Sequence, residues 1–475
     1  MQPTWTQARE RAGERLEVRD PATGELLETI PAGAAADADA AVGAARAAFA
    51  GWRETAPADR AAALKAAARA LRERLDAIAE LQTRENGKPL ADSRGGVEAG
   101  IGAIEQYAEL GPLHRGGRLA GGWSATDEMV HEPRGVVVLL VPWNDPVAIA
   151  CGQIAAALVT GNTVVFKPSE KTPLSGALVA DILAEHLPAG VLNLVLGDGR
   201  AGRALVAHPD VDLIMHTGSV ATGREIAKVA AGTAKKVLLE LGGKDALIVD
   251  AGVDPEWAAE QAAIGAFANA GQICTSVERI YVHESIAEPF VSALTRRAEE
   301  LTVGPGLDPD SEMGPLIDDG QRDLVDEHVR EAVRDGAEIR TGGRTLGERG
   351  SFYAPTVLTG VRDEMRIMRE ETFGPVAAVR AVASFDEALA AANEGEYGLA
   401  ATVLTADDEH ARRAARELDV GTVKVNAVFG GAPGGAAQPR RASGTGFGYG
   451  PELLDELTVT KVVHRAHAVP ARPAS

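Results

Sequence analysis

The chain has 475 residues, of which 45% are hydrophobic and 24% charged, and this length is enough for two or three packed domains. Its formal net charge of -20 argues against a nucleic-acid-binding surface and against binding to an anionic membrane leaflet, because both attract basic faces. With only two cysteines, Cys151 and Cys274, the sequence excludes a disulfide framework and a cysteine-based zinc site. Any cysteine chemistry must therefore rest on a single thiol.

The N-terminal sequence lacks the basic segment and the apolar run of a secretory signal, so we expect a cytoplasmic protein. Apolar stretches such as 136–141 are far shorter than the roughly 20 residues that a membrane span needs. We therefore expect no membrane partner, no nucleic-acid partner and no metal.

Residues 34–108 are rich in alanine and have the amphipathic spacing of helices. Within 61–81 the apolar residues recur at intervals of three and four, namely Leu64, Ala68, Leu71, Leu75 and Ile78. The pattern predicts a helix over 61–81, in a helical segment that covers a sheet from outside.

After Arg134 the sequence changes to short β-branched runs that alternate with helical segments. The expected strands lie at 136–141, 164–166, 192–196 and 213–216. Each is followed by a helix, and this alternation predicts right-handed crossovers and a parallel sheet.

A second alternating region begins near Ala246 and predicts a second α/β domain. Its expected strands lie at 279–282, 376–382, 400–404 and 422–425. The tract 430–450 is rich in Gly, Pro and Arg, and we predict a surface loop or linker there.

Cys274 lies in the sequence Asn-Ala-Gly-Gln-Ile-Cys-Thr-Ser, at the end of an alanine-rich helix and just before a strand. A thiol in such a loop can face a cleft between packed elements. A lone cysteine is more often a small buried hydrophobe, so this motif alone does not establish a nucleophile.

Two further motifs carry the groups that thioester chemistry requires. Glu240 follows an apolar strand, and Gly242 and Gly243 after it permit a tight turn close to a ligand. Asn144 stands at a strand end between two prolines, where a fixed amide suits an oxyanion. Alone, such a glutamate is more often a solvated strand end, and such an asparagine is more often a turn residue or helix cap.

Two motifs at the carboxyl ends of strands indicate where a dinucleotide would bind. Lys167-Pro-Ser169-Glu170 follows one strand, and Thr-Gly218-Ser219 opens a helix after another. Ligands of open parallel sheets bind at these strand ends, and a helix N-terminus with small residues admits a pyrophosphate. The usual G-x-G-x-x-G fingerprint is absent, and each motif alone also fits a capping sequence or a surface turn.

Together these residues make the sequence resemble the aldehyde dehydrogenase superfamily, in its NAD(P)-dependent, hydrolytic form. Six motifs stand in family order and at family-like spacing: Pro-Trp-Asn-x-Pro, Lys-Pro-Ser-Glu, Thr-Gly-Ser-x-x-x-Gly, Glu-Leu-Gly-Gly-Lys, Gly-Gln-x-Cys and Glu-x-Phe-Gly-Pro. The similarity covers nearly the whole chain.

The resemblance implies a catalytic role for three residues. Cys274 would be the nucleophile, Glu240 the general base, and Asn144 an oxyanion donor together with the Cys274 backbone N–H. In the implied reaction the thiolate adds to an aldehyde, hydride leaves to NAD, and water activated by Glu240 hydrolyses the thioester. No metal is needed.

The resemblance also implies a cofactor site for NAD, with NADP possible. The residues expected there are Trp143, Lys167, Ser169, Glu170, Gly218, Ser219, Gly242, Glu371 and Phe373. Lys167 and Glu170 would hold the adenosine ribose, and Ser219 the pyrophosphate. Glu371 and Phe373 would seat the nicotinamide ribose and ring.

The family fold implies an α/β protein with three parts. A Rossmann-like dinucleotide-binding domain with a parallel sheet is expected over 1–112 and 134–243. A second α/β domain, the catalytic domain, is expected over 244–431. A small β-arm for oligomerisation is expected over 113–133 and 450–475, in a homodimer or homotetramer.

Two departures from the family pattern leave the aldehyde unnamed. Asp145 stands where many members carry an aromatic residue, which suggests either recognition of a cationic or hydroxylated aldehyde or a helix-capping aspartate. The loop at 432–449 lacks the family's Phe and is longer by several residues, and in relatives this loop closes the substrate mouth.

Two other functions stay open at this point. On the same scaffold a coenzyme-A-acylating dehydrogenase would resolve the thioester with a thiol, although a water-activating Glu240 argues against it. A non-catalytic binding protein would keep the site as a relic, which the intact Cys274, Glu240, Asn144 and Lys167 oppose.

Overall fold

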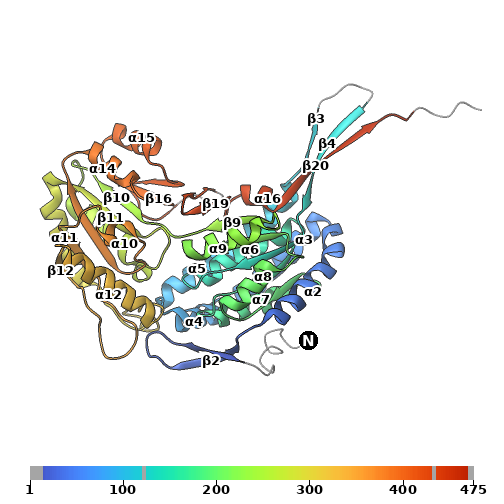
Figure 1. Ribbon diagram of the computed structural model, residues 1–475, viewed down its shortest axis with the longest axis horizontal. Coiled ribbons are helices and arrows are strands. Elements are labelled where there is room, and N and C mark those ends of the chain that lie inside the picture. The colour runs from blue at the N-terminus through green and yellow to red at the C-terminus, as the bar shows by residue number, and fades with distance from the viewer. Residues whose placement is uncertain (1–13, 120–124, 431–434, 469–475) are drawn as a thin grey trace, which may run out of the picture.

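The computed structural model describes residues 14–119, 125–430 and 435–468. Two large, mainly parallel sheets lie beside each other with their own helices, and a smaller three-stranded sheet projects away from both (Figure 1). The predicted α/β class is therefore confirmed. The parts of the predicted domains, arm and substrate loop that fall in 1–13, 120–124, 431–434 and 469–475 lie outside the described residues.

Four helices follow an N-terminal hairpin that sequence patterns did not predict. The hairpin is β1 (Arg15–Arg19) and β2 (Leu26–Pro31), and the helices are α2 (Ala35–Glu54), α3 (Pro57–Glu73), α4 (Leu75–Asn86) and α5 (Leu90–Leu110). The single helix expected over 61–81 is wrong, because the chain leaves helical geometry at Arg74 between α3 and α4 (φ -110°, ψ 9°). The five apolar positions of that pattern are nevertheless buried in one core.

The first large sheet has the strand order β19-β9-β8-β5-β6-β7. Its strands are β5 (Val136–Leu140), β6 (Thr163–Lys167), β7 (Leu192–Leu194), β8 (Leu213–Thr217), β9 (Lys236–Glu240) and β19 (Gly444–Thr445). All neighbours are parallel except β19, which runs antiparallel to β9. The parallel sheet expected from the alternating pattern is confirmed.

Helices cover both faces of this sheet, which explains why its strands are apolar throughout. Val136 and Val138 of β5 pack into the core with α2, α8 (Gly199–Ala207) and α9 (Val220–Ala231). Val137 and Leu139 point to the opposite face, into the core with α3, α5, α6 (Pro146–Val159) and α7 (Pro173–Ala184).

The tract 430–450 is not only a loop or linker, and that prediction is wrong for its second half. β18 (Arg440–Arg441) pairs with β15 (Tyr397–Gly398), and β19 pairs with β9 so that Gly444 lies opposite Glu240. Gly444 has a φ of +137°, and a Cβ there would overlap the Leu239 carbonyl. A glycine therefore permits this close approach of two strands.

The second large sheet has the strand order β12-β13-β14-β11-β10-β16-β17. Its strands are β10 (Asp245–Val249), β11 (Val277–His283), β12 (Glu338–Thr341), β13 (Thr356–Thr359), β14 (Val376–Val382), β16 (Ala400–Leu404) and β17 (Thr422–Val425). Its helices are α10 (Pro255–Phe267), α11 (Ala287–Glu300), α12 (Asp319–Arg334), α13 (Arg366–Arg369), α14 (Phe385–Asn393) and α15 (Asp408–Glu417). The expected second α/β region is confirmed. Among the helices of the described residues, none has the length and apolar character to cross a membrane.

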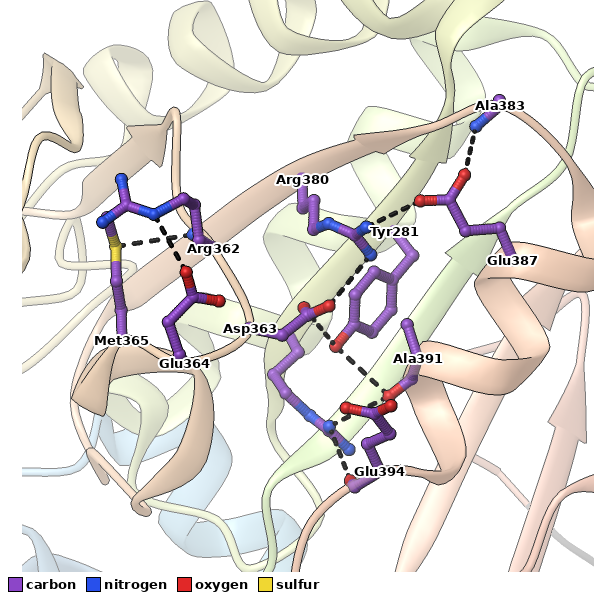
Figure 2. A network of polar contacts seen from close by, with 11 residues as sticks. Tyr281, Arg362, Asp363, Glu364, Met365, Arg380, Ala383, Glu387, Ala391 and Glu394 are labelled. Carbon is purple, nitrogen blue, oxygen red and sulfur yellow. Dashed lines mark hydrogen bonds and ion pairs between the residues drawn. The ribbon is translucent and has the colours of Figure 1, made fainter.

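A set of polar contacts, the Tyr281 network, joins β11, β14 and α14 within this half of the molecule (Figure 2). The Tyr281 hydroxyl lies 3.4 Å from Asp363 Oδ1 and 3.4 Å from the Ala391 carbonyl. Arg380 forms ion pairs with Asp363 (3.2 Å) and Glu387 (2.6 Å). These contacts connect neighbouring elements around one arginine.

The projecting sheet consists of β3 (Gly117–Leu119), β4 (Ala125–Pro133) and β20 (Thr458–Ala466), which follows the short helix α16 (Glu452–Glu456). β20 pairs with β4 along its whole length. Large apolar side chains are exposed on these strands, namely Leu119, Met129, Val130, Val459 and Val462. The strands fall within the segments expected to form the arm, and their role in assembly stays a prediction.

Candidate active site

A cavity of about 270 Å³ is lined by residues at the carboxyl ends of strands of the first sheet, by residues that precede strands of the second sheet, and by residues of α12. Nine of the twelve residues expected in the site line it: Trp143, Asn144, Gly218, Ser219, Glu240, Gly242, Cys274, Glu371 and Phe373. The other three, Lys167, Ser169 and Glu170, lie outside its lining, at the carboxyl end of β6.

A left-handed turn carries the chain from α10 to Cys274. Asn269 (φ 49°), Ala270 (φ 54°) and Gly271 (φ 71°) all have positive φ. For residues other than glycine this conformation costs on the order of 1 to 3 kcal/mol each and persists only where the surroundings enforce it. Gly271 approaches Gly374 so closely that a Cβ would overlap its carbonyl. The turn therefore fixes the Cys274 loop against the segment that carries Glu371 and Phe373.

The Cys274 thiol is protonated at neutral pH in this environment. Burial raises its pKa to about 12, and the carboxyl groups of Asp245, Glu240 and Glu371 act in the same direction, while Lys424 lowers it. A thiolate is the nucleophilic form of cysteine. Cys274 must therefore give its proton to a base when it reacts.

Asn144 is buried and held in place by the residues before Cys274. Its Nδ2 donates a hydrogen bond to the Gln272 carbonyl (2.9 Å). Its own backbone carbonyl accepts from the side-chain amides of Asn269 (3.4 Å) and Asn86 (3.4 Å). An amide nitrogen carries two hydrogens, and Gln272 uses one, which leaves the other for a group in the cavity.

Glu240 lies at the end of β9, with its carboxyl group against Gly448. Its Oε1 is buried and has no hydrogen-bond partner among the residues that the structure describes. Burial raises the pKa of this carboxyl group to about 8, although the Gly448 backbone lowers it. Glu240 can therefore take up or release a proton near neutral pH, as a general base must.

A buried ion pair holds the backbone of the segment that bears Glu371 and Phe373. Glu278 accepts hydrogen bonds from the backbone N–H groups of Thr372 (2.8 Å) and Phe373 (2.8 Å). Lys244, the last residue of Glu-Leu-Gly-Gly-Lys, pairs with Glu278, and both side chains are almost completely buried. The pair thus ties this segment to the start of both β10 and β11.

Gln321 of α12 holds the same segment from the other side. Its Nε2 donates to the carbonyls of Thr372 (3.1 Å) and Phe373 (3.0 Å), and Phe373 itself has a φ of 52°. The segment places the Glu371 carboxyl group over the glycine turn after β9, where it accepts the Gly243 N–H (3.0 Å). Side chains and backbone from three elements therefore converge on one wall of the cavity.

The opposite wall consists of strand ends of the first sheet. Ser219 caps α9, with its Oγ accepting the Thr222 N–H (3.3 Å), and the Trp143 ring meets Phe373 edge to face at 5.3 Å between centroids. At Gly242 a Cβ would overlap the Glu371 carboxyl group, which would then have to move from its present position. A helix N-terminus beside a side-chain-free turn at strand ends fits a dinucleotide.

The three residues after β6 form a separate polar group next to this wall. Lys167 is buried, which lowers its pKa, and its Nζ donates to the Pro168 carbonyl (2.7 Å) and pairs with Glu170 (3.6 Å). The Glu170 side chain is 43% exposed. Ser169 is buried, and its Oγ accepts the Lys171 N–H (3.3 Å). The exposed carboxylate of Glu170 remains accessible to a ligand.

A comparison with models of protein families shows to which family the chain belongs. The model of the family described as aldehyde dehydrogenase matches residues 5–463. The chain belongs to the aldehyde dehydrogenase family. Residues 5–463 include both large sheets and every residue of the cavity lining.

Solved structures agree with this family assignment. A betaine aldehyde dehydrogenase from Staphylococcus aureus in complex with NAD+ is 32% identical, with 99% of this chain and 98% of that chain covered and a TM-score of 0.93. A 3,6-anhydro-L-galactose dehydrogenase in complex with NAP is 35% identical, with 95% of this chain and 96% of that chain covered and a TM-score of 0.93.

Asp145 of this aldehyde dehydrogenase does not cap the helix that it precedes, so the capping interpretation is wrong. Its side chain makes no hydrogen bond to the first turn of α6 and instead forms an ion pair with Lys88 Nζ (3.2 Å). Lys88 is buried, and an unpaired charge there would be costly. The negative charge of Asp145 is therefore already balanced, which weakens the idea that it recognises a cationic aldehyde.

Within the described residues of this aldehyde dehydrogenase, one cluster of residue types that can bind a metal occurs. Its members lie just before β3, in β4 and in α16. Single ligand atoms of His114, His131 and Asp455 lie within 4.8 Å of one another. The two imidazole rings stack at 4.3 Å between centroids, and His114 Nε2 forms a hydrogen bond with Asp455 (2.8 Å). Ring stacking and one ion pair account for the cluster.

Sequence motifs missed several residues that shape the active site of this aldehyde dehydrogenase. Gln321 and Leu324 reach the cavity from α12, and Glu278 holds a cavity wall from β11. None of them belongs to a motif of the sequence analysis, and the glycine next to Gln321, Gly320, lies in the first turn of α12. Only the packing of α12 and β11 against the 371–373 segment identifies them.

Proposed function

We propose that this aldehyde dehydrogenase uses NAD to oxidise an aldehyde to the carboxylic acid, through a thioester on Cys274 that Glu240-activated water hydrolyses. The observation that supports the proposal most is the meeting of Cys274, Glu240 and Asn144 around one cavity, together with residues suited to a dinucleotide. A buried carboxyl group with a raised pKa beside the nucleophile favours hydrolysis over transfer to coenzyme A.

In the first step the Cys274 thiol gives its proton to solvent, and its sulfur adds as the thiolate to the aldehyde carbon. The carbonyl oxygen becomes an oxyanion, which the free N–H of the Asn144 side chain and the Cys274 backbone N–H stabilise. Preorganised donors of this kind contribute about 3 to 4 kcal/mol each in comparable sites. The three hydrogen bonds that Asn144 makes with Gln272, Asn86 and Asn269 keep its amide in position for this role.

NAD supplies a hydride acceptor when it is bound, so that the substrate remains on Cys274 as a thioester. Glu240 then deprotonates a water molecule, whose oxygen attacks the thioester carbon. The carbon–sulfur bond breaks, the carboxylic acid leaves, and the Cys274 thiolate that is released takes up the proton that Glu240 drew from the water. General-base positioning accelerates such a step by about 100-fold or more.

The residues that would hold NAD lie at the strand ends of the first sheet and on the opposite wall. Lys167 and Glu170 would bind the adenosine ribose, with Ser169 beside them. Gly218 and Ser219 at the N-terminus of α9 would bind the pyrophosphate. The nicotinamide would lie by Trp143, Gly242, Glu371 and Phe373, which line the cavity around Cys274.

We also propose that the arm of β3, β4 and β20 joins copies of the chain into a homodimer or homotetramer. Its exposed apolar side chains suit burial in an interface. Light scattering should then give a mass above the 49.3 kDa of one chain, and a mass of 49.3 kDa at micromolar concentration would contradict the proposal. A cytoplasmic location stays a prediction.

The proposal is tested by replacing each cysteine in turn. Cys274→Ala should abolish NAD reduction with every aldehyde of a panel, because no other described thiol lines the cavity. Cys151→Ala is the matched control, since Cys151 is fully buried against α5 and should leave activity intact. The assay is run without coenzyme A.

Activity that survives in Cys274→Ala would contradict the proposed nucleophile. Wild-type turnover that depends on added coenzyme A would instead support the acylating alternative. Cofactor binding, measured by fluorescence, should stay near normal in Cys274→Ala, which separates loss of chemistry from loss of folding.

A further inference from the structure

Gln153 is a buried polar side chain in a helix that is otherwise apolar. Besides Gln153, α6 consists of alanine, valine, isoleucine and leucine with one proline, one glycine and Cys151. Gln153 is 5% exposed. A buried amide costs stability unless its polar atoms are hydrogen-bonded. The position therefore needs an explanation other than packing.

One half of this amide binds Thr217, which lines the cavity around Cys274. Gln153 Nε2 donates a hydrogen bond to Thr217 Oγ1 (3.0 Å). Gln153 Oε1 is buried and has no partner among the described residues. A leucine would fill this space without leaving an oxygen unpartnered. The hydrogen bond to Thr217 is therefore the feature that distinguishes Gln153 from a packing residue.

The hydrogen bond from Gln153 restricts the direction in which the Thr217 hydroxyl can donate. A hydroxyl carries one hydrogen and two lone pairs, and Gln153 Nε2 occupies one of the lone pairs. Because Nε2 is a donor, the hydroxyl cannot donate back to it. Within the part of the chain that the structure describes, no hydrogen bond takes up the Thr217 hydroxyl hydrogen. This hydrogen is therefore available to a group in the cavity.

Thr217 stands directly beside Glu240. The two residues are register partners at the ends of the parallel strands β8 and β9, and neighbouring strands lie about 4.8 Å apart. Met215 of β8 and Leu238 of β9 face the core that includes α6. Side chains alternate along a strand, so Thr217 and Glu240, each two residues farther on, belong to that same face. Both also line the cavity.

The hydroxyl and the carboxyl group together suit a water molecule. The cavity, at about 270 Å³, has room for water, and a bound water needs two to four polar partners. The Thr217 hydroxyl can donate to the water oxygen, and the Glu240 carboxylate can accept one of the water hydrogens. The second lone pair of the water oxygen then stays free to attack a thioester on Cys274, which lines the same cavity.

We propose that Gln153 is a positioning residue for thioester hydrolysis, which fixes the Thr217 hydroxyl so that this hydroxyl and Glu240 hold the attacking water between them. The proposal rests on the proposed function, because it needs the thioester on Cys274. In this step the water oxygen bonds to the thioester carbon, one water proton passes to Glu240, and the carbon–sulfur bond breaks. The Thr217 hydroxyl keeps its proton and orients the water, and Gln153 acts only through Thr217.

The first experiment separates the formation of the thioester from its hydrolysis. Rapid mixing with NAD and an aldehyde gives the rate of formation from the burst of reduced NAD, and the rate of hydrolysis from the turnover that follows. In Gln153→Leu hydrolysis should slow by about tenfold, the scale of one lost hydrogen bond. The burst rate and the dissociation constant of NAD, measured by fluorescence, should stay within about twofold of wild type.

Further variants test whether Gln153 acts through Thr217. Thr217→Val should slow hydrolysis at least as much as Gln153→Leu, and the double variant should be no slower than Thr217→Val alone. Thr217→Ser keeps the hydroxyl and should stay near wild type. Gln153→Glu keeps the size but accepts only, as a carboxylate, and should be as slow as Gln153→Leu. The control Gln106→Leu replaces a half-buried glutamine of α5 outside the cavity lining and should change neither rate.

The second experiment lets hydroxylamine compete with water for the thioester. Its nitrogen is a stronger nucleophile than water and does not need the water position, and the product is a hydroxamic acid. At a fixed concentration of hydroxylamine, the ratio of hydroxamic acid to carboxylic acid therefore reports how well the water is held. This ratio should rise about tenfold in Gln153→Leu and in Thr217→Val, rise further in Glu240→Gln, and stay unchanged in Gln106→Leu.

The outcomes separate this proposal from the proposed function. A product ratio unchanged in Gln153→Leu, or a burst rate that falls as much as hydrolysis, would overturn the role of Gln153 alone. Weaker binding of NAD at an unchanged ratio would assign Thr217 to the cofactor and also overturn that role. If Gln153→Leu does not fold, the ratios of Gln153→Glu and Thr217→Val decide. A wild type that gives neither a burst nor hydroxamic acid would contradict both proposals.

Discussion

The cavity around Cys274 and the Tyr281 network both involve polar groups from the second sheet, but their hydrogen bonding differs. In the network Arg380 is paired with two carboxylates, and the Tyr281 hydroxyl has two oxygen neighbours (Figure 2). Around the cavity, Glu240 Oε1 and Asp245 Oδ2 are buried without a partner among the described residues. An unpartnered buried polar group costs about 1 to 3 kcal/mol.

Backbone conformation shows the same contrast. The turn before Cys274 and the residue Phe373 adopt positive φ values, whereas the residues of the Tyr281 network do not. Unfavourable conformations and unpaired groups are found where a protein uses them in binding or chemistry. The comparison teaches that the charges of the Tyr281 network are balanced within the protein, although one nitrogen of Arg380 makes an ion pair without a hydrogen bond, whereas the cavity keeps buried oxygens that can accept from a bound group.

The largest expected effect on turnover comes from replacing Glu240, whose Oε1 has no hydrogen-bond partner among the described residues. In Glu240→Gln the acyl-enzyme should accumulate, because no base activates the water that releases it. Rapid mixing should show about one equivalent of reduced NAD per active site, followed by turnover slower than wild type by about 100-fold or more. Unchanged steady-state turnover would place the base elsewhere.

Glu240 should also make the rate of thioester hydrolysis depend on pH. Burial raises the pKa of Glu240 to about 8, and its basic form exists above that pKa. The rate of thioester hydrolysis should therefore rise with pH up to about 8 and then level off. Glu240→Gln should lack this rise, and a wild-type rate that falls between pH 6 and pH 8 would contradict the assignment.

A pair of variants compares the two regions directly. Gln321→Leu removes two hydrogen bonds to the segment that bears Glu371 and Phe373, at about 1 kcal/mol each. The KM for NAD should rise about tenfold, because this wall seats the nicotinamide in our proposal. Tyr281→Phe is the control: it removes two contacts of 3.4 Å from the other region.

Tyr281→Phe should lower the melting temperature by a few degrees and leave both kcat and KM near wild type. Cofactor titration and thermal unfolding of both variants give the comparison. An equal change of KM in the two variants would show that the Tyr281 network supports the cavity after all.

The smallest expected effect lies outside both regions, at the ion pair between Lys167 and Glu170 after β6. If Glu170 binds the ribose hydroxyls, a 2′-phosphate at 4 to 5 Å would meet a like charge, with a repulsion of about 3 kcal/mol before screening. Wild type should prefer NAD over NADP. In Glu170→Gln the relative efficiency with NADP should gain about three- to tenfold, because Glu170 is 43% exposed and Lys167 becomes free to meet the phosphate.

Catalytic efficiency with each cofactor at saturating aldehyde measures this preference. Wild-type preference for NADP, or no relative gain in Glu170→Gln, would show that Glu170 does not read the ribose.

The sequence predicted those parts of the site that are local in the chain. Glu240, Ser219 and Asn144 each follow a strand, and parallel strands bring their carboxyl ends to one edge of a sheet, so the motifs indicated a shared site. The strands themselves were predictable because they are apolar on both faces and alternate with helices.

The parts that could not be predicted depend on contacts between distant residues. Gln321 and Glu278 look like ordinary residues of a helix and a strand, and only tertiary packing brings them to Phe373. Composition also concealed β19, since a glycine-rich tract has low β-propensity and becomes a strand here only by pairing with β9. The break at Arg74 escaped prediction because the apolar spacing continues through it.

The pairing of Gly444 with Glu240 has a consequence for the synthesis of the protein. A ribosome makes residues 134–243 long before 444, and domains generally begin to fold as units while the chain is still growing. The first large sheet therefore lacks its edge strand β19 until residues 444–445 have emerged. A nascent chain holds Cys274 but leaves Glu240 without the strand that lies beside it. In the proposed mechanism, the hydrolytic part of the site is therefore complete only after residues 444–445 have been made, and a chain that lacks them loses the support of Glu240 rather than Cys274.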